Sequence, residues 1–231
     1  MAEIGDDILK AKNFLEKNEL VAIPTETVYG LAANALNPIA VAKIFEAKER
    51  PTFDPLIVHT YSLKEVKKFD KDIHPALQKL ATNFWPGPLT LLLPKKEMIP
   101  NLVTSGLDRV GVRVPNHPLT LELLSQLDFP LAAPSANPFG YISPTTAIHV
   151  EKQLGTKIPY VLDGGNCEIG LESTIVGEEG GEIIIYRLGG LSIDDIEAVV
   201  GKVSVQLNQS SNPKAPGQLK SHYAPKTPVY I

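Results

Sequence analysis

A hydroxyl-rich turn and two cations are the first groups along the chain that could do chemistry. The turn PTETVYG (Pro24 to Gly30) directly follows an apolar segment, and Lys48 and Arg50 come later. Threonine hydroxyls and backbone N–H groups between a strand and a helix can bind an anion or cap the helix. The guanidinium of Arg50 could bind two phosphate oxygens at once, and the ammonium of Lys48 could bind phosphate as a point charge. A helix dipole, however, also favours cations at the C-terminal end of a helix. The spacing therefore predicts either an anion site or ordinary helix ends.

Further polar groups interrupt apolar segments downstream. Arg113 lies within Val112 to Val114 and needs a partner, which is either a carboxylate of the protein or one of a ligand. The triplet Ser135 to Asn137 lies between prolines, where it could contact phosphates or a purine edge or simply form a turn. His59 as a single histidine is more typical of a structural residue, and Asp54 could cap, bind a metal or accept from a ribose or base.

Composition restricts the class of protein. The chain has 231 residues, 43% hydrophobic and 21% charged, with a net charge of −4. These values are typical of a globular protein and argue against binding of nucleic acid through bulk charge. Cys167 is the single cysteine, so we expect no disulfide and a cytoplasmic location. We expect neither a signal peptide nor a membrane span, and neither GxxxxGK[ST] nor GxGxxG occurs.

Hydrophobic periodicity and turn signals predict alternating strands and helices in a single α/β domain with a mixed sheet, over residues 1–205. The expected strands are 20–23, 56–59, 89–93, 110–114, 131–133, 160–163, 173–176 and 182–187. The expected helices are 6–18, a helix from Asn37 to about Lys48, 63–69, 74–84, 117–127, 144–154 and 192–200. Residues 206–231 are polar, contain prolines and lack a helical stripe, so they predict a linker arm.

Seven motifs along the chain resemble the YrdC-like threonylcarbamoyl-AMP synthases in type and order. They are PTETVYG, KERP (from Lys48), PLIVH (from Pro55), WPGPLT (from Trp85), GVRVP (from Gly111), PSAN (from Pro134) and ESTIV (from Glu172). The resemblance implies a twisted mixed sheet with surrounding helices, similar to that of DHBP synthase, and an open, positively charged groove. The family joins L-threonine, bicarbonate and ATP to form threonylcarbamoyl-AMP and pyrophosphate, for the threonylcarbamoyladenosine modification of tRNA.

The resemblance also implies roles for individual residues. The expected threonine-binding residues are Thr27, His59, Arg113 and Ser173. The expected ATP-binding residues are Lys48, Arg50, Asp54, Ser135, Asn137, Ser143, Arg187 and Tyr223, with Lys48 and Arg50 also catalytic. Mg²⁺ is expected to arrive with ATP, with no separate metal site in the protein. A downstream tRNA-modifying transferase complex would receive the product, and no tight direct binding to nucleic acid is expected.

Two features depart from the family pattern. Asp54 stands where the family resemblance leads us to expect Asn in many members, which weakens its assignment as a ligand of ATP. The arm resembles the linker of longer, two-domain synthases, so we expect residues 206–231 to lie over the groove, with His222 and Tyr223 nearest the nucleotide, in a fragment or short form without the second domain. The alternatives are an RNA-binding module that uses the groove for tRNA or ribosomal RNA, and a carbamoyl-transfer domain of a hydrogenase-maturation protein.

Overall fold

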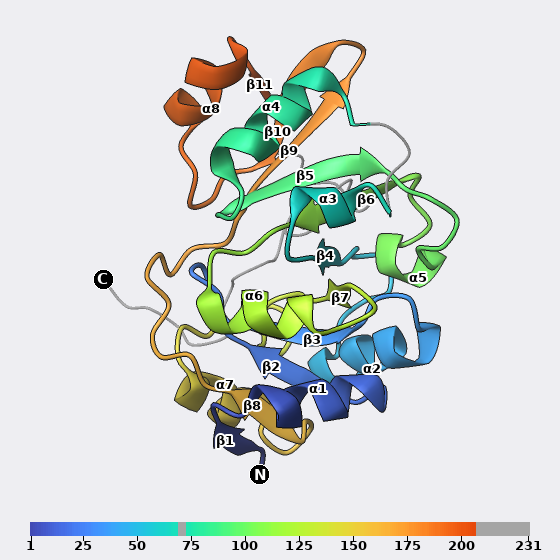
Figure 1. Cartoon of the computed structure of the whole chain (residues 1–231), viewed down its shortest axis with the longest axis vertical. Helices are drawn as coiled ribbons and strands as arrows, with labels where there is room; N and C mark the ends of the chain where they lie inside the picture. The colour runs from blue at the N-terminus through green and yellow to red at the C-terminus, as the bar shows by residue number, and fades with distance from the viewer. Residues whose placement is uncertain (69–72, 207–231) are drawn as a thin grey trace.

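The computed structural model describes residues 1–68 and 73–206, and within them the strands form one 11-stranded sheet (Figure 1). The strand order is β1-β8-β2-β3-β7-β4-β6-β5-β9-β10-β11. The strands are β1 (Glu3–Gly5), β2 (Val21–Ile23), β3 (Gly30–Asn34), β4 (Ile57–His59), β5 (Leu89–Pro94), β6 (Arg109–Arg113), β7 (Leu131–Ala132), β8 (Tyr160–Leu162), β9 (Thr174–Glu179), β10 (Glu182–Arg187) and β11 (Ser204–Val205).

The sheet is mixed, as the sequence predicts. Strands β4 and β6 run parallel, as do β5 and β9, whereas β6 runs antiparallel to β5 and β2 antiparallel to β3. Strands β2, β4 and β6 are almost entirely buried, because both faces of the sheet are covered, and this explains the apolar runs 21–23, 57–58 and 110–112 within them.

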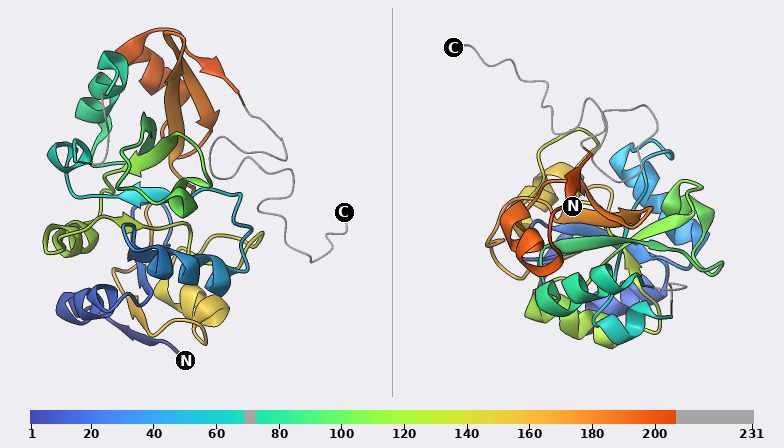
Figure 2. Two further views of the ribbon diagram at one scale, coloured as in Figure 1. Left: turned by 90° about the vertical axis from the view of Figure 1, so that its right-hand side faces the viewer. Right: turned by 90° about the horizontal axis from the view of Figure 1, so that it is seen from above.

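Helices cover both faces of the sheet. Figure 2 (left) shows α1 and α6 on one side and α2 and α7 on the other. The helices of the described part are α1 (Ile8–Glu16), α2 (Pro38–Lys48), α3 (Leu63–Val66), α4 (Pro75–Phe84), α5 (Asn101–Thr104), α6 (Pro118–Ser125), α7 (Ala147–Leu154) and α8 (Ile193–Val200). Alternation along β2 divides the core accordingly: Val21 and Ile23 pack in a cluster with α1 and α6, and Ala22 packs in the cluster that contains α2.

Local signals set several helix ends where the sequence predicts them. The Asn37 side chain accepts hydrogen bonds from the backbone N–H groups of Ile39 and Ala40, and Pro38 occupies the first turn of α2. Asp7 caps α1 in the same manner. Helix α2 ends at Lys48, and Glu49 adopts a left-handed conformation with φ 55°, so the chain turns sharply before Arg50.

The prediction that Thr25 to Thr27 join a strand to a helix is wrong. The turn joins β2 to the antiparallel strand β3, which is not among the strands expected from the sequence. Residues Gly30–Asn34 contain no β-branched or aromatic residue, so nothing in their composition indicates a strand. Their extended conformation comes instead from pairing with β2 on one side and β7 on the other.

Other boundaries also differ from those expected. Helix α7 begins at Ala147, because Thr146 and not Ser143 is its cap, and α3 ends at Val66. The short elements β1, α5 and β11 are absent from the prediction, since segments of two to four residues carry too little periodicity to be recognised. No helix of the described residues is long and apolar enough to cross a membrane. The predicted arm, with His222 and Tyr223, lies outside the described residues apart from its first residue.

Candidate active site at the ends of three strands

Three adjacent strands bring polar side chains to one level of the sheet. In the register of β4, β6 and β5, Arg113 lies opposite His59 on one side and Thr90 on the other. Residues directly opposite each other in neighbouring strands point to the same face. All three are buried, so a polar cluster forms where most of the sheet is apolar.

A pocket opens beside this cluster, and it is lined by residues from distant parts of the chain. It contains many of the residues expected for ligand binding, namely Thr27, Arg50, His59, Arg113, Ser135, Ser173 and Arg187. The β2–β3 turn contributes one wall, and the triplet at Ser135 lies against it, since Ser135 and Gly30 form an isolated antiparallel bridge. A Cβ at Gly30 would come within 3.3 Å of the Ala133 Cβ, which shows how closely the two segments approach.

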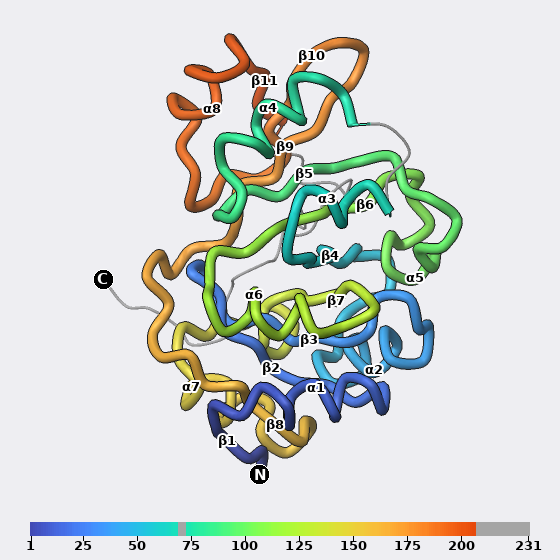
Figure 3. The backbone as a smooth tube through the Cα atoms, viewed as in Figure 1, coloured from blue at the N-terminus to red at the C-terminus, as the bar shows by residue number. Residues whose placement is uncertain are grey.

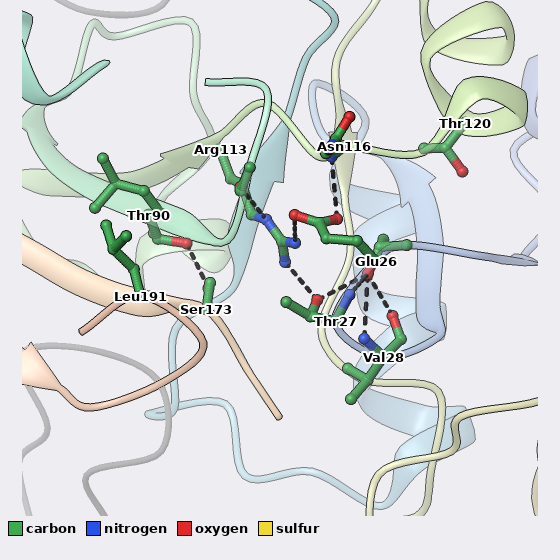
Figure 4. A network of polar contacts seen from close by, with 12 residues as sticks. Glu26, Thr27, Val28, Thr90, Arg113, Asn116, Thr120, Ser173 and Leu191 are labelled. Atoms are coloured by element: carbon green, nitrogen blue, oxygen red, sulfur yellow. Dashed lines mark hydrogen bonds and ion pairs between the residues drawn. The ribbon is translucent and has the colours of Figure 1, made fainter. Parts of the chain in front are cut away.

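Arg113 has a protein partner for its charge. Its Nη2 lies 2.7 Å from Glu26 Oε1, its Nη1 donates to Thr27 Oγ1 at 2.9 Å and its Nε donates to the carbonyl of Gly87 at 3.2 Å (Figure 4). Burial lowers the pKa of Arg113, while the nearby Glu26 carboxylate acts in the opposite direction. Arg113 is therefore paired with a protein carboxylate, and its expected contact with a ligand carboxylate stays a prediction. Nε and Nη1 make hydrogen bonds, whereas Nη2 lies beside Glu26 as an ion pair and makes no hydrogen bond within the described residues.

The Thr27 hydroxyl has a fixed direction. Thr25 Oγ1 donates its proton to the carbonyl of Val28 at 2.7 Å, so it must accept in its 2.8 Å bond with Thr27 Oγ1. Thr27 is then the donor to Thr25, and it accepts from Arg113. Because a hydroxyl has one proton, Thr27 can only accept a further hydrogen bond from a ligand.

His59 is a neutral side chain in this pocket. It is 3% exposed, and burial together with the nearby positive charge of Arg113 lowers its pKa to about 3. Within the described residues its Nδ1 has no hydrogen-bond partner. His59 therefore lines the pocket as an uncharged ring whose Nδ1 is not accessible to solvent.

Ser173 connects the polar cluster to Arg187. Thr90 Oγ1 and Ser173 Oγ are 2.7 Å apart. Arg187 donates from Nε and Nη2 to the carbonyl of Ser173, and from Nη2 also to the Ser173 hydroxyl at 3.0 Å. Both Ser173 and Arg187 line the pocket, so this network positions an arginine and a hydroxyl side by side.

Arg50 lies at another part of the pocket wall and pairs locally. Its Nη2 is 2.9 Å from Asp54 Oδ2, and its Nε and Nη2 donate to the carbonyls of Asp54 and Pro55. Asp54 is completely buried behind Arg50 and does not line the pocket. The expected contact of Asp54 with ATP therefore stays a prediction, whereas its contact with Arg50 is direct.

Lys48 is not among the pocket-lining residues. Its ammonium is buried and donates to the carbonyls of Ser135 and Asn137, so it joins the end of α2 to the Ser135 turn. Burial, and then the nearby Arg50 charge, lowers the pKa of Lys48 well below its usual value. A direct contact between Lys48 and a phosphate stays a prediction.

The remaining expected residues lie around the pocket. Asn137 donates from its side chain to the carbonyls of Pro138 and Tyr141. Ser143 donates to the carboxylate of Glu172 at 2.5 Å, and Glu172 itself lines the pocket. The predicted contact of Tyr223 lies outside the described residues. Glu26 and Glu172 are functional candidates that the sequence does not indicate by themselves; the buried position of Arg113 predicts a carboxylate partner without saying which one.

Comparison with known proteins gives two family matches. Residues 13–189 match the Sua5, YciO and YrdC family, described as telomere recombination, and residues 191–231 match the C-terminal domain of threonylcarbamoyl-AMP synthase. A threonylcarbamoyl-AMP synthase of Pyrococcus abyssi is 45% identical over 96% of this chain and 66% of its own length. One of Bacillus subtilis is 43% identical over 97% of this chain and 66% of its own. The chain thus spans just under two thirds of the length of these relatives.

Solved structures show the same fold. The Sua5 protein of P. abyssi in complex with L-threonine superimposes with a TM-score of 0.92 and 45% identity, covering 94% of this chain and 65% of that protein. A second P. abyssi Sua5 structure, the H234A/Y235A variant, gives a TM-score of 0.91 over 95% of this chain and 67% of that protein. With the family match over residues 13–189, these findings place the chain in the Sua5, YciO and YrdC family.

Proposed function

We propose that this chain catalyses the synthesis of threonylcarbamoyl-AMP from L-threonine, bicarbonate and ATP. The observation that carries the proposal is the joining of two residue groups in one pocket. Arg113, Thr27 and His59 form a wall suited to a small amino acid, and Arg50 and Ser135 line the same pocket on the side expected for phosphates. The names of the relatives and the threonine complex of the P. abyssi protein support this assignment.

The proposed chemistry has two steps. The threonine amine attacks the carbon of bicarbonate and loses a proton, and water leaves, so that a carbamate forms. A carbamate oxygen then attacks the α-phosphorus of ATP, and the bond to the β-phosphate oxygen breaks to release pyrophosphate. Neither step needs a covalent protein nucleophile, so the protein acts by positioning the reactants and by neutralising charge.

The amino-acid end of the pocket discriminates between donors and acceptors. Arg113 lines the pocket and has more N–H groups than the two that bond to Gly87 and Thr27, so it can receive the threonine carboxylate as a bidentate pair. Thr27 can only accept, so it would meet the amino or hydroxyl group of threonine and not its carboxylate. His59 stays uncharged at neutral pH, so it adds no positive charge beside Arg113, and Ser173 offers a hydroxyl.

The nucleotide end is proposed to bind ATP through Arg50, Ser135 and Arg187. Lys48 would act through its hydrogen bonds to the Ser135 and Asn137 carbonyls, because these bonds fix the backbone of the turn beside the pocket. The Ser143 hydroxyl donates to Glu172, so a ligand that accepts a hydrogen bond from Ser143 would have to replace that carboxylate. Asp54 would keep Arg50 oriented toward the phosphates.

Mg²⁺ is proposed to enter with the triphosphate, since phosphate oxygens are among its preferred ligands. When bound, it would offset charge on the phosphates. In the part of the chain that the structure describes, no group of three or more His, Cys, Asp and Glu side chains could hold a metal. We further propose that the protein acts in the cytoplasm and that a tRNA-modifying transferase complex consumes the product.

The test is release of pyrophosphate from ATP, with mass spectrometry of the adenylate. We expect release to require both threonine and bicarbonate and to be lost in Arg50→Ala and Lys48→Ala. ATP breakdown without threonine and without an adenylate product would refute the proposal. Tight, strongly salt-dependent binding of RNA in place of turnover would favour the RNA-binding alternative.

A further inference from the structure

Glu26 is a buried carboxylate whose two oxygens hold different parts of the chain. Oε1 pairs with Arg113 Nη2 at 2.7 Å, and Oε2 accepts from the backbone N–H of Asn116 at 3.0 Å (Figure 4). The residue is 4% exposed. It therefore connects the β2–β3 turn to Arg113 at the end of β6 and to the segment that follows it.

The backbone around Glu26 is held as firmly as its side chain. The carbonyls of Glu26 and Thr27 accept from the N–H groups of Ile169 and Gly170, at 2.8 and 3.0 Å. These two residues belong to the connection between β8 and β9, which passes along one side of the molecule (Figure 3). Glu26 thus has little freedom to follow Arg113 if the guanidinium moves.

We propose that Glu26 is a positioning residue for amino-acid binding, which acts by holding the guanidinium of Arg113. This inference rests on the proposed function and deepens it. The shortest of the three contacts of Arg113 is the one with Glu26, and it joins two opposite charges. The ion pair fixes the position of Nη2 and the hydrogen bond to Thr27 fixes Nη1, so the guanidinium plane has a fixed orientation toward a ligand carboxylate.

A glutamine cannot reproduce this arrangement. The side chain of Glu26 meets two donors, Arg113 and the N–H of Asn116. A glutamine amide has one oxygen and one NH₂ group, so one of these donors would face another donor. An aspartate keeps the charge but is shorter by a methylene group, so it would not reach both donors from the same backbone position.

Charge and position predict opposite effects of Glu26→Gln on threonine affinity. If Glu26 only neutralised Arg113, its removal would leave the guanidinium free to attract the substrate carboxylate more strongly, and affinity would rise. If Glu26 positions Arg113, the bidentate geometry is lost and affinity falls. Glu26→Asp separates the two roles again, because it keeps the charge and alters only the geometry.

Calorimetry with threonine and threoninamide tests the proposal on the full chain. We expect Glu26→Gln and Glu26→Asp each to raise the threonine Kd about tenfold or more, as for a misplaced charged contact. The Kd for threoninamide, which lacks the carboxylate, should change less than about twofold, because Arg113 has no carboxylate to bind in it. The matched control is Glu19→Gln, which removes one charge from the surface ion pair with Lys43.

The outcomes are distinct. An unchanged or lower threonine Kd in both Glu26 variants would overturn the positioning role. Equal losses for threonine, threoninamide and ATP would show a general structural role and would also overturn it. If Glu26→Gln does not fold, Glu26→Asp alone tests the proposal, by the same comparison of the changes in Kd for threonine and for threoninamide. Failure of the wild-type protein to bind threonine would instead count against the proposed function.

Discussion

Arg50 and Arg113 are both buried arginines in one pocket, and each pairs with a carboxylate, but the pairs are built differently. Arg50 contacts Asp54 and the carbonyls of Asp54 and Pro55, all within five residues. Arg113 contacts Gly87 in one segment and Glu26 and Thr27 in another, and Thr27 and Arg113 are 86 positions apart in the sequence. The first pair shapes one loop, whereas the second joins the β2–β3 turn to the middle of the sheet.

The difference suits the two ends of the proposed site. A phosphate chain is large and highly charged, so a single rigid loop with a cation can receive it. A free amino acid is small, so its recognition requires several groups placed accurately with respect to one another. Contacts from distant segments provide that placement only after the whole domain has folded.

Arg113→Met should have the largest effect, because it leaves Glu26 charged and buried without its partner. We expect a loss of about 3–5 kcal/mol in the free energy of unfolding, and no measurable threonine binding. Denaturant unfolding and calorimetry would measure the two effects. The double variant Arg113→Met with Glu26→Gln should regain much of the stability but none of the binding; equal instability of the single and double variants would contradict the ion-pair explanation.

Arg50→Met should destabilise less, by about 2–3 kcal/mol, since its carbonyl partners lie in the same short loop and can rearrange together. ATP binding should weaken strongly and pyrophosphate release should be lost, as in Arg50→Ala, with the threonine Kd unchanged. Addition of Asp54→Asn should restore stability. A change in threonine affinity equal to that in ATP would erase the distinction between the two pairs.

The pH dependence of stability should report on His59, which lies opposite Arg113. Its pKa is about 3 in the folded protein and about 6.5 when unfolded, so protonation favours unfolding. Stability from this group is therefore complete above pH 6.5 and falls toward pH 3, at up to about 1.4 kcal/mol per pH unit. Between pH 7 and pH 5, the wild type should lose about 2 kcal/mol more than His59→Asn, as measured by urea unfolding. Parallel losses in the two proteins would contradict a depressed pKa.

Thr90→Val should have the smallest effect of the four. It removes one hydroxyl of the Thr90–Ser173 pair but keeps the volume, and Ser173 retains its contact with Arg187. We expect a loss of about 1 kcal/mol in the free energy of unfolding. Thermal unfolding would measure it, with Thr82→Val on the exposed face of α4 as the control. A loss as large as that of Arg113→Met would show that the long-range network depends on Ser173 more than on the ion pair.

Local features of the site follow from the sequence with little help from the fold. The Asn37–Pro38 start of α2, its end at Lys48 and the apolar strands β4, β5 and β6 were all predictable, because caps and hydrophobic runs act over a few residues. The family motifs also mark most of the residues that line the pocket. Strand β3 was not predictable, because its extended conformation depends on pairing with β2 and β7.

Sequence alone determined the family, the mixed α/β class and the requirement that Arg113 find a partner for its charge. Only the tertiary structure decided that this partner is Glu26, that Thr27 accepts a hydrogen bond from Arg113 and that Lys48 donates to the carbonyls of Ser135 and Asn137. The physical reason is that a buried charge is unfavourable without an opposite charge or hydrogen bonds. Which group provides them depends on which segments the folded sheet brings within hydrogen-bonding distance.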